Sequence, residues 1–201
     1  MKSIAICGVD GSGKSTIVNM LEESNILKNV FFFRRTKYED GNLNLVKKYF
    51  PRKYGDSRDW KESAFGKNIG LGILLDFIRC YDQNVKAMEN YDYVVFDRFL
   101  PCYLAYIDIF EDVTPLKDLL SKFIQPDLTL YIDAGISNLE KRYLDRQSCG
   151  DDEDIELMRM FGESYLHVFG KFQIKYRVID NSGDLSSTKD QVLTAIKPLI
   201  A

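Results

Sequence analysis

Nine residues near the N-terminus have the types and spacing that phosphate binding requires. Gly8-Val9-Asp10-Gly11-Ser12-Gly13-Lys14-Ser15-Thr16 has the pattern G-x-x-x-x-G-K-S and stands between an apolar run and an amphipathic stretch. Glycines let successive backbone N–H groups turn inward around phosphates. We expect Lys14 to reach the β and γ phosphates and Ser15 to offer its hydroxyl to Mg²⁺. The pattern predicts nucleotide binding; the alternative is a glycine turn before a helix.

A carboxylate and a guanidinium follow another apolar run. Asp97 and Arg98 come directly after Tyr93-Val94-Val95-Phe96. In enzymes with such a phosphate loop, an aspartate at this place helps to hold Mg²⁺, and an arginine can grip a second phosphate with two hydrogen bonds. The pair therefore predicts a metal ligand and a phosphate ligand. The alternative is an ion pair at the end of a strand.

Further candidates for an acceptor pocket lie after the second and third apolar runs. Arg34 and Arg35 follow the run that ends at Phe33, and two guanidinium groups suit an acceptor that already carries a phosphate. Tyr103 and Tyr106 follow Arg98 closely enough to line the same pocket.

The elements that must position these residues alternate between strand and helix. Short apolar runs, separated by segments of helix length, occur at 3–7, 29–33, 93–96, 128–132 and 176–179. This alternation predicts an α/β fold in which helices cover both faces of a parallel sheet. Ligands bind such sheets at the carboxyl ends of the strands, where the candidate residues stand.

Composition limits the classes of partner. The chain has 201 residues, of which 45% are hydrophobic and 28% charged, with a net charge of -3. We expect a single domain over 1–201 and no nucleic-acid partner, because there is no basic excess. No apolar run reaches the ~20 residues of a membrane span, so we expect no membrane partner and a cytoplasmic location. Four scattered cysteines predict reduced thiols.

Several motifs resemble those of the thymidylate kinase family of P-loop nucleoside monophosphate kinases. The phosphate loop with its Asp10, Asp97-Arg98-Phe99, the strand from Pro126 to Asp133 and the loop Ile179-Asp180-Asn181-Ser182-Gly183 are similar to family motifs along essentially the whole chain. The resemblance implies a five-stranded sheet in the order 2-3-1-4-5 and transfer of a phosphoryl group from Mg·ATP to dTMP. ATP and Mg²⁺ would then be the cofactors, and the partner a small nucleotide.

The resemblance also implies roles for individual residues. Asp10 would lie near the sugar or phosphate of the acceptor, and Lys14 and Arg98 would be catalytic. The ATP ligands would be Gly8, Asp10, Gly11, Ser12, Gly13, Lys14, Ser15, Thr16, Arg142 and Ser182. The acceptor ligands would be Asp10, Arg34, Arg35, Phe77, Arg79, Arg98 and Tyr103, with Ser15 and Asp97 on the metal.

A helix and a polar stretch have the features of a lid at about 142–154. Ser137-Asn138-Leu139-Glu140 has capping-box spacing, which predicts the start of a helix with Arg142 and Arg146 on one face. Family members without an arginine in the phosphate loop supply one from the lid. Gly11 occupies that loop position, so the resemblance makes Arg146 the catalytic lid residue and Arg142 a neighbour of adenine. Exposed, functionless arginines are the alternative.

The segment from Ile69 to Met88 is apolar on more than one helical face. Such a helix lies wholly in the core or gives one face to a partner. The corresponding family helix makes a dimer interface, so the resemblance implies a homodimer.

Three classes of function fit the sequence. The first is a nucleoside monophosphate kinase. The second is a deoxynucleoside kinase, which phosphorylates a 5′-hydroxyl and needs a carboxylate base; Glu39 or Asp40 could fold back to supply it. The third is a nucleotide-gated binding protein without kinase activity.

Overall fold

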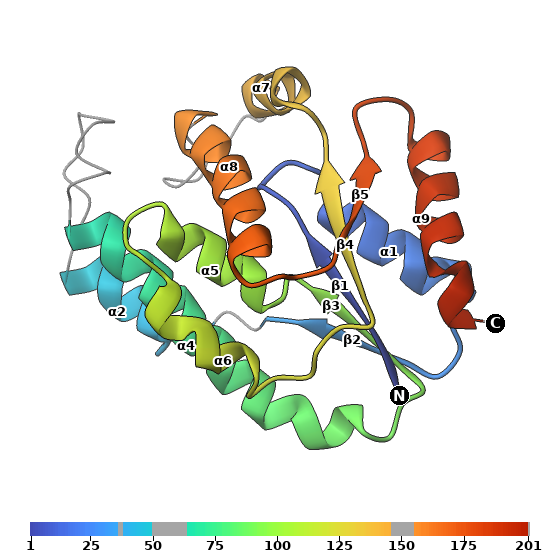
Figure 1. The fold of residues 1–201 in the computed structure, drawn as a ribbon, viewed down its shortest axis with the longest axis horizontal. Coiled ribbons are helices and arrows are strands. Elements are labelled where there is room, and N and C mark those ends of the chain that lie inside the picture. The colour runs from blue at the N-terminus through green and yellow to red at the C-terminus, as the bar shows by residue number, and fades with distance from the viewer. Residues whose placement is uncertain (36–37, 50–63, 146–154, 201) are drawn as a thin grey trace.

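The computed structural model describes residues 1–35, 38–49, 64–145 and 155–200 as a three-layer α/β fold (Figure 1). Five parallel strands form one sheet in the order β2-β3-β1-β4-β5, which confirms the expected topology. The strands are β1 (Lys2–Cys7), β2 (Val30–Arg34), β3 (Tyr93–Asp97), β4 (Leu128–Asp133) and β5 (Arg177–Asp180). Each predicted strand boundary agrees with the structure to within one residue.

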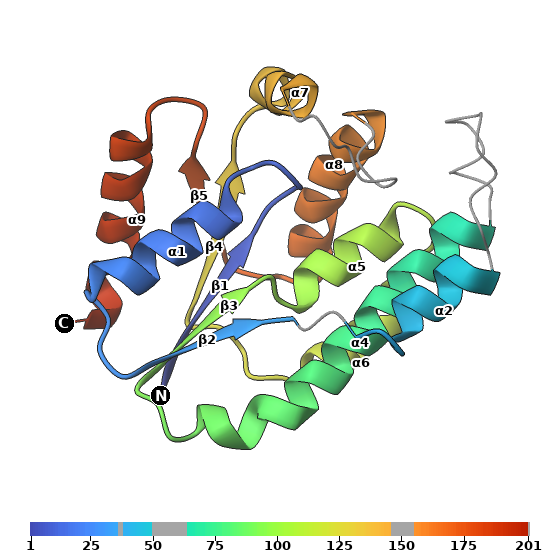
Figure 2. The ribbon, with the colours of Figure 1, turned by 180° about the vertical axis from the view of Figure 1, so that it is seen from behind.

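Helices flank the sheet on both sides. They are α1 (Lys14–Ser24), α2 (Asn42–Tyr49), α4 (Ala64–Met88), α5 (Leu100–Asp108), α6 (Lys117–Leu120), α7 (Ile136–Leu144), α8 (Ile155–Lys171) and α9 (Leu185–Ile200), with a 3₁₀ turn at Thr114–Leu116. Seen from either side, α1 and α9 cover one face, and α4, α5 and α8 cover the other (Figures 1 and 2). None of the described helices is long and apolar enough to cross a membrane.

Two apolar clusters fill the space between the layers. Successive strand side chains point to opposite faces, so Ile4 and Ile6 pack toward α1 and α9, while Ala5 and Cys7 pack toward α4, α5 and α8. Both faces of β1 are buried for this reason, and its sequence is almost continuously apolar. Burial of both faces fixes the end of β1, from which the phosphate loop starts.

The start of α7 differs from the prediction. The helix begins at Ile136, so Ser137 lies inside its first turn, and the residue at the N-cap is Gly135, which makes no side-chain cap hydrogen bond. The Asp133 carboxylate instead accepts the N–H of Gly135 at 2.8 Å. The predicted capping box at Ser137 and Glu140 is therefore wrong, because Asp133, before the helix, stabilises the turn that leads into α7.

Candidate active site

The phosphate loop joins β1 to α1 and depends on two glycines for its path. Gly8 has φ +144° and Gly13 has φ +100°, conformations that side chains rarely adopt. A Cβ on Gly8 would lie 2.5 Å from the carbonyl oxygen of Ile132, and one on Gly13 would lie 2.3 Å from Nδ2 of Asn181. The loop therefore passes close to β4 and to the end of β5 only because these positions lack side chains.

Lys14 is the first residue of α1 and is only 4% exposed. Its Nζ donates to the carbonyl oxygen of Val9 at 2.6 Å and lies 3.8 Å from Asp10. Burial, and next the Arg98 charge, lower the pKa of Lys14 to about 8, although Asp10 acts in the opposite direction. A phosphate group in the loop would add further negative charge beside this buried ammonium and so favour its charged form.

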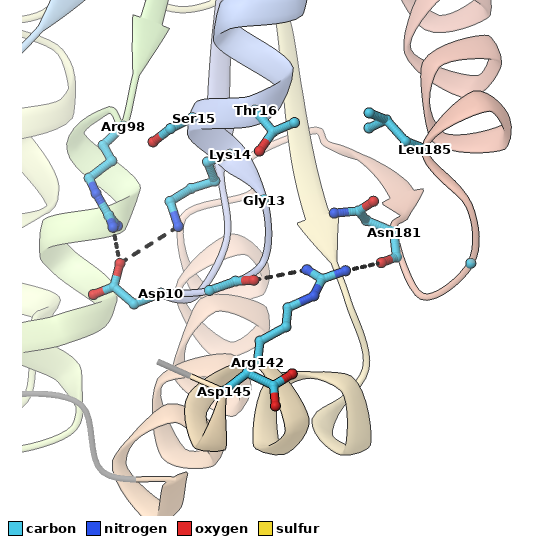
Figure 3. Close-up of a pocket in the computed structure, with 12 residues that line it drawn as sticks. Asp10, Gly13, Lys14, Ser15, Thr16, Arg98, Arg142, Asp145, Asn181 and Leu185 are labelled. Atoms are coloured by element: carbon cyan, nitrogen blue, oxygen red, sulfur yellow. Dashed lines mark hydrogen bonds and ion pairs between the residues drawn. The ribbon is translucent and has the colours of Figure 1, made fainter. Parts of the chain in front are cut away.

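Arg98 follows β3 with a left-handed backbone, φ +70°, which costs roughly 1 to 2 kcal/mol for a residue with a side chain. Its guanidinium points toward Asp10, with which it pairs (Figure 3). Burial would lower the pKa of Arg98, but the Asp10 carboxylate outweighs burial and raises it, so the guanidinium keeps its charge. Asp10 therefore holds two cations, Lys14 and Arg98, side by side.

Two cavities meet at these residues. One cavity, of about 600 Å³, runs along the phosphate loop, and we call it the donor cavity. It is lined by Lys14 to Thr16 together with Asp10, Gly11, Gly13, Arg98, Arg142, Asp145, Asn181, Gly183 and Leu185. The acceptor cavity, of about 280 Å³, lies between α2, α4, α5 and α8. Asp10 and Arg98 line both. Two ligands that fill the cavities would thus present their phosphates to the same pair of side chains.

On the donor side, Arg142 connects α7 to the loop. Its guanidinium donates to the carbonyl oxygens of Gly11 at 2.9 Å and of Asn181 at 3.0 Å (Figure 3). Asn181 in turn donates to the carbonyl oxygen of Ser12 at 2.7 Å. Ser182, a predicted ATP ligand, is exposed and does not line the cavity, whereas its neighbours Asn181 and Gly183 do.

The metal candidates and the lid are only partly described. Ser15 lines the donor cavity, and Asp97 ends β3 next to Arg98. Hydroxyl and carboxylate oxygens are the donors that Mg²⁺ prefers. Arg146 and residues 147–154 lie outside the described residues, so the predicted roles of Arg146 and of the lid stay predictions.

On the acceptor side, the structure separates the two adjacent arginines. Arg35 lines the cavity, but Arg34 bonds with Asn19 and Glu22 at 2.8 Å each, on the α1 side of the sheet. Neighbouring residues at a strand end point in opposite directions, so only one of the two can face the acceptor. The structure does not bring Arg34 to the cavity.

Phe77 and Arg79 are likewise not brought to the acceptor cavity. Phe77 is fully buried among aromatic rings, including those of Tyr103 and Phe99. The Arg79 guanidinium lies over the Tyr38 ring at 4.2 Å and pairs with Asp40 at 3.4 Å. Sequence reasoning placed them by resemblance, and in this chain both side chains are engaged elsewhere.

Tyr103 is brought to the cavity as predicted. It lines the cavity, is 3% exposed, and its hydroxyl finds no hydrogen-bond partner within the described part of the chain. Buried hydroxyls are rarely left unpaired, which is consistent with a bound acceptor supplying the partner.

The rest of the acceptor cavity was missed by sequence reasoning. These lining residues are Tyr38, Leu43, Asn44, Lys47, Ile73, Asp76, Cys102, Leu157, Met158 and Phe161, while Tyr106 was expected. Most of them are apolar or stand on helices that no motif marks. Helical periodicity predicts that such residues are buried, but the same pattern serves both core and pocket.

Cys102 has an unusual environment in the acceptor cavity. Burial would raise the pKa of its thiol, but the neighbouring Cys7 thiol and the Arg98 charge outweigh burial and lower it. Tyr165 closes this cluster from α8 and donates to the carbonyl oxygen of Gly8 at 3.0 Å. The positive charge of Arg98 thus reaches the wall of the acceptor cavity.

The chain is similar to thymidylate kinases over its whole length. It is 26% identical to a probable thymidylate kinase of Metallosphaera sedula, with 100% of this chain and 95% of the relative covered, and 27% identical to a thymidylate kinase of Ruthia magnifica, with 98% of each covered. No protein-family model matches the chain.

Solved structures share the fold. Thymidylate kinase from Candida albicans is 19% identical with a TM-score of 0.67, and the match covers 98% of this chain and 92% of the Candida albicans chain. Deoxyadenosine kinase from M. mycoides is 17% identical with a TM-score of 0.65, and the match covers 98% of this chain and 99% of that one.

Proposed function

We propose that the chain, which is similar to thymidylate kinases over its whole length, is a nucleoside monophosphate kinase that transfers the γ-phosphoryl group of ATP to dTMP and forms dTDP. The observation that carries this proposal is the pair of cavities that meet at Asp10 and Arg98, beside Lys14. One cavity takes ATP along the phosphate loop. The other takes the acceptor.

The reaction needs charge neutralisation more than a base. An oxygen of a monophosphate is already anionic, so the obstacle is the approach of two negatively charged groups. Lys14 and Arg98 provide positive charge where the two cavities meet, and Arg35 adds a third cation on the acceptor side. Fixed cations of this kind stabilise the charge on the transferring phosphoryl group, and the cavities hold the reacting oxygens in line.

We place Mg²⁺ at Ser15 and Asp97, whose oxygens suit it. When bound with ATP, the ion would neutralise charge on the β and γ phosphates. Arg146 would add a cation from the lid, because the loop position taken by Gly11 carries none. Arg142 already reaches the loop and would lie beside the adenine.

A deoxynucleoside kinase remains the second candidate, because structures of that class share the fold. Such an enzyme needs a carboxylate base near a neutral hydroxyl. Asp40 is engaged by Arg79, and neither Glu39 nor Asp40 lines the acceptor cavity. Asp10 is engaged by Arg98. The cationic lining favours an acceptor that carries a phosphate.

We also propose a cytoplasmic homodimer. Cys7, Cys80 and Cys102 are buried and carry thiols rather than disulfides, as suits a reducing compartment. The dimer would form along α4.

The test is an ADP-release assay with ATP and a panel of nucleosides and their 5′-monophosphates. We expect dTMP to be phosphorylated fastest and its nucleoside, thymidine, slower by about four decades, because a nucleoside would leave the acceptor-side cations unpaired. Lys14→Ala should lower kcat by roughly two to four decades while the circular dichroism spectrum stays unchanged. A nucleoside that outcompetes every monophosphate would overturn the proposal in favour of the second candidate.

A further inference from the structure

The outer wall of the acceptor cavity is α2, a short helix whose position depends on other elements. Leu43, Asn44 and Lys47 of α2 line the cavity. Yet α2 has only 8 residues, and none of them is buried. Isolated helices shorter than about 12 residues are marginal in water. The position of this wall must therefore be fixed from outside α2.

Asp76 on α4 fixes the first turn of α2 through hydrogen bonds. It is 1% exposed, and both of its oxygens accept hydrogen bonds from the first turn of α2. Oδ1 accepts the backbone N–H of Asn42 at 2.7 Å and its side-chain amide at 3.0 Å, and Oδ2 accepts the N–H of Leu43 at 3.1 Å. The first N–H groups of a helix have no partner within it, and α2 has no acidic residue in its own first turn.

The same face of α4 holds the chain on either side of Asn42. Gly72, Asp76, Arg79 and Gln83 are spaced by four, three and four residues, which places them on one helical face. Arg79 lies over Tyr38, whose hydroxyl donates to Gln83 at 2.7 Å. A Cβ on Gly72 would lie 3.1 Å from a methyl carbon of Val46, so α2 lies close against α4 there (Figures 1 and 2).

Asp76 differs from Gly72, Arg79 and Gln83 on this face because it lines the acceptor cavity, and its carboxylate is buried there. We infer that Asp76 is a positioning residue of the acceptor site, which fixes α2 so that Leu43, Asn44 and Lys47 face the bound acceptor. The inference rests on the proposed function, with dTMP as the acceptor. Asp76 touches α2 rather than the reacting atoms, so its loss should weaken acceptor binding and leave ATP binding unchanged.

A carboxylate suits this role better than an amide. Asp76 uses both oxygens as acceptors, whereas an asparagine has one oxygen and would turn its NH₂ group toward one of the N–H donors. Asp76→Asn is therefore nearly isosteric but removes part of the cap. Asp82→Asn is the matched control, because Asp82 is on the same helix and exposed.

The experiment measures steady-state kinetics and amide hydrogen exchange for these variants. In Asp76→Asn we expect the KM for dTMP to rise about tenfold, the KM for ATP to stay within twofold, and amides of residues 42–49 to exchange faster than in the wild type. Amides of the sheet should exchange as before. Asp82→Asn should match the wild type. Asn42→Ala, which removes only one donor to Asp76, should raise the KM for dTMP two- to threefold and serves if Asp76→Asn does not fold.

Three outcomes would overturn the inference: an unchanged KM for dTMP, an equal rise of both KM values, or unchanged exchange in α2. The exchange measurement needs no turnover. If the wild type phosphorylates no monophosphate, the proposed function fails, and exchange in the ligand-free variants still decides whether Asp76 fixes α2.

Discussion

The charge of Lys14, and with it the electrostatics of the site, depends on pH. Its ammonium is buried beside Arg98, and these two causes bring its pKa from an ordinary 10.5 to about 8. In the free enzyme, Lys14 is therefore charged below pH 8 and loses its proton as the pH rises through 8. A neutral amine attracts phosphate poorly. Bound ATP adds negative charge nearby, which raises the pKa again and restores the proton.

We therefore predict different pH profiles for kcat/KM and kcat. The value of kcat/KM for ATP should fall above about pH 8, because it reports the free enzyme, whereas kcat at saturating ATP should hold to higher pH. Initial rates between pH 6 and 10 measure both. Lys14→Arg, whose side chain stays charged, should lose the alkaline fall in kcat/KM even if it is slower. Profiles that fall at the same pH would contradict this account.

The types of residue at the site could be predicted from the sequence more easily than the directions in which their side chains point. The phosphate loop was found because glycine, lysine and serine at fixed spacing have few other uses. Arg34 and Arg35 could not be told apart, because their difference depends on which side of the strand end each one faces. Asp76 gave no signal, since an acidic residue in an amphipathic helix is ordinary.

At the scale of elements, apolar runs predicted all five strands because a parallel strand is buried on both faces. The wall of the acceptor cavity was less accessible to prediction. It combines parts of α2, α4, α5 and α8, whose juxtaposition depends on packing between segments far apart in sequence. The wrong prediction of a capping box at Ser137 has a local cause, because Asp133 rather than Ser137 stabilises the turn before α7.

Arg142 on α7 and Arg146, which follows four residues later in the sequence, should have different roles. Arg142 bonds to the backbone of the phosphate loop and of Asn181 after β5, so Arg142→Ala should raise the KM for ATP several-fold with a smaller effect on kcat. Arg146→Ala should do the reverse, because we expect its contact to form in the reacting complex. Lys141→Ala on the same helix is the control. Small and equal effects of both arginine variants would return them to the class of exposed arginines.

At the scale of the molecule, the strand order brings the two substrates together. Strand β1 carries the phosphate loop and lies between β3, which ends at Asp97 before Arg98, and β4, which leads to α7 and Arg142. The residues that we propose to bind the acceptor therefore gather on the β3 side and those proposed to bind ATP on the β4 side, with Asp10 between them. One parallel sheet thus separates two specificities and joins them at the reacting phosphates.

Helix α4 serves the whole molecule with three faces. One face is in the core through Leu74, Phe77 and Tyr81, and a second holds α2 through Asp76. A third exposes Leu71 and Leu75, which are 40% and 49% accessible in the single chain. The helix is therefore not wholly in the core of one chain, and its exposed leucines, one turn apart, suit the self-complementary interface of a symmetric dimer.

We predict that the chain sediments as a dimer at micromolar concentration and that Leu71→Asp combined with Leu75→Asp makes it a monomer. Two carboxylates from each protomer, facing each other across an apolar interface, would have to be desolvated without partners, which costs more than such an interface gains. Neither leucine lines the donor cavity or the acceptor cavity, so each protomer should keep its kcat. Leu166→Asp, at a leucine of similar exposure on α8, is the matched control and should leave the dimer intact. A wild-type monomer in analytical ultracentrifugation, or a dimer that survives the double substitution, would assign the α4 leucines to another role.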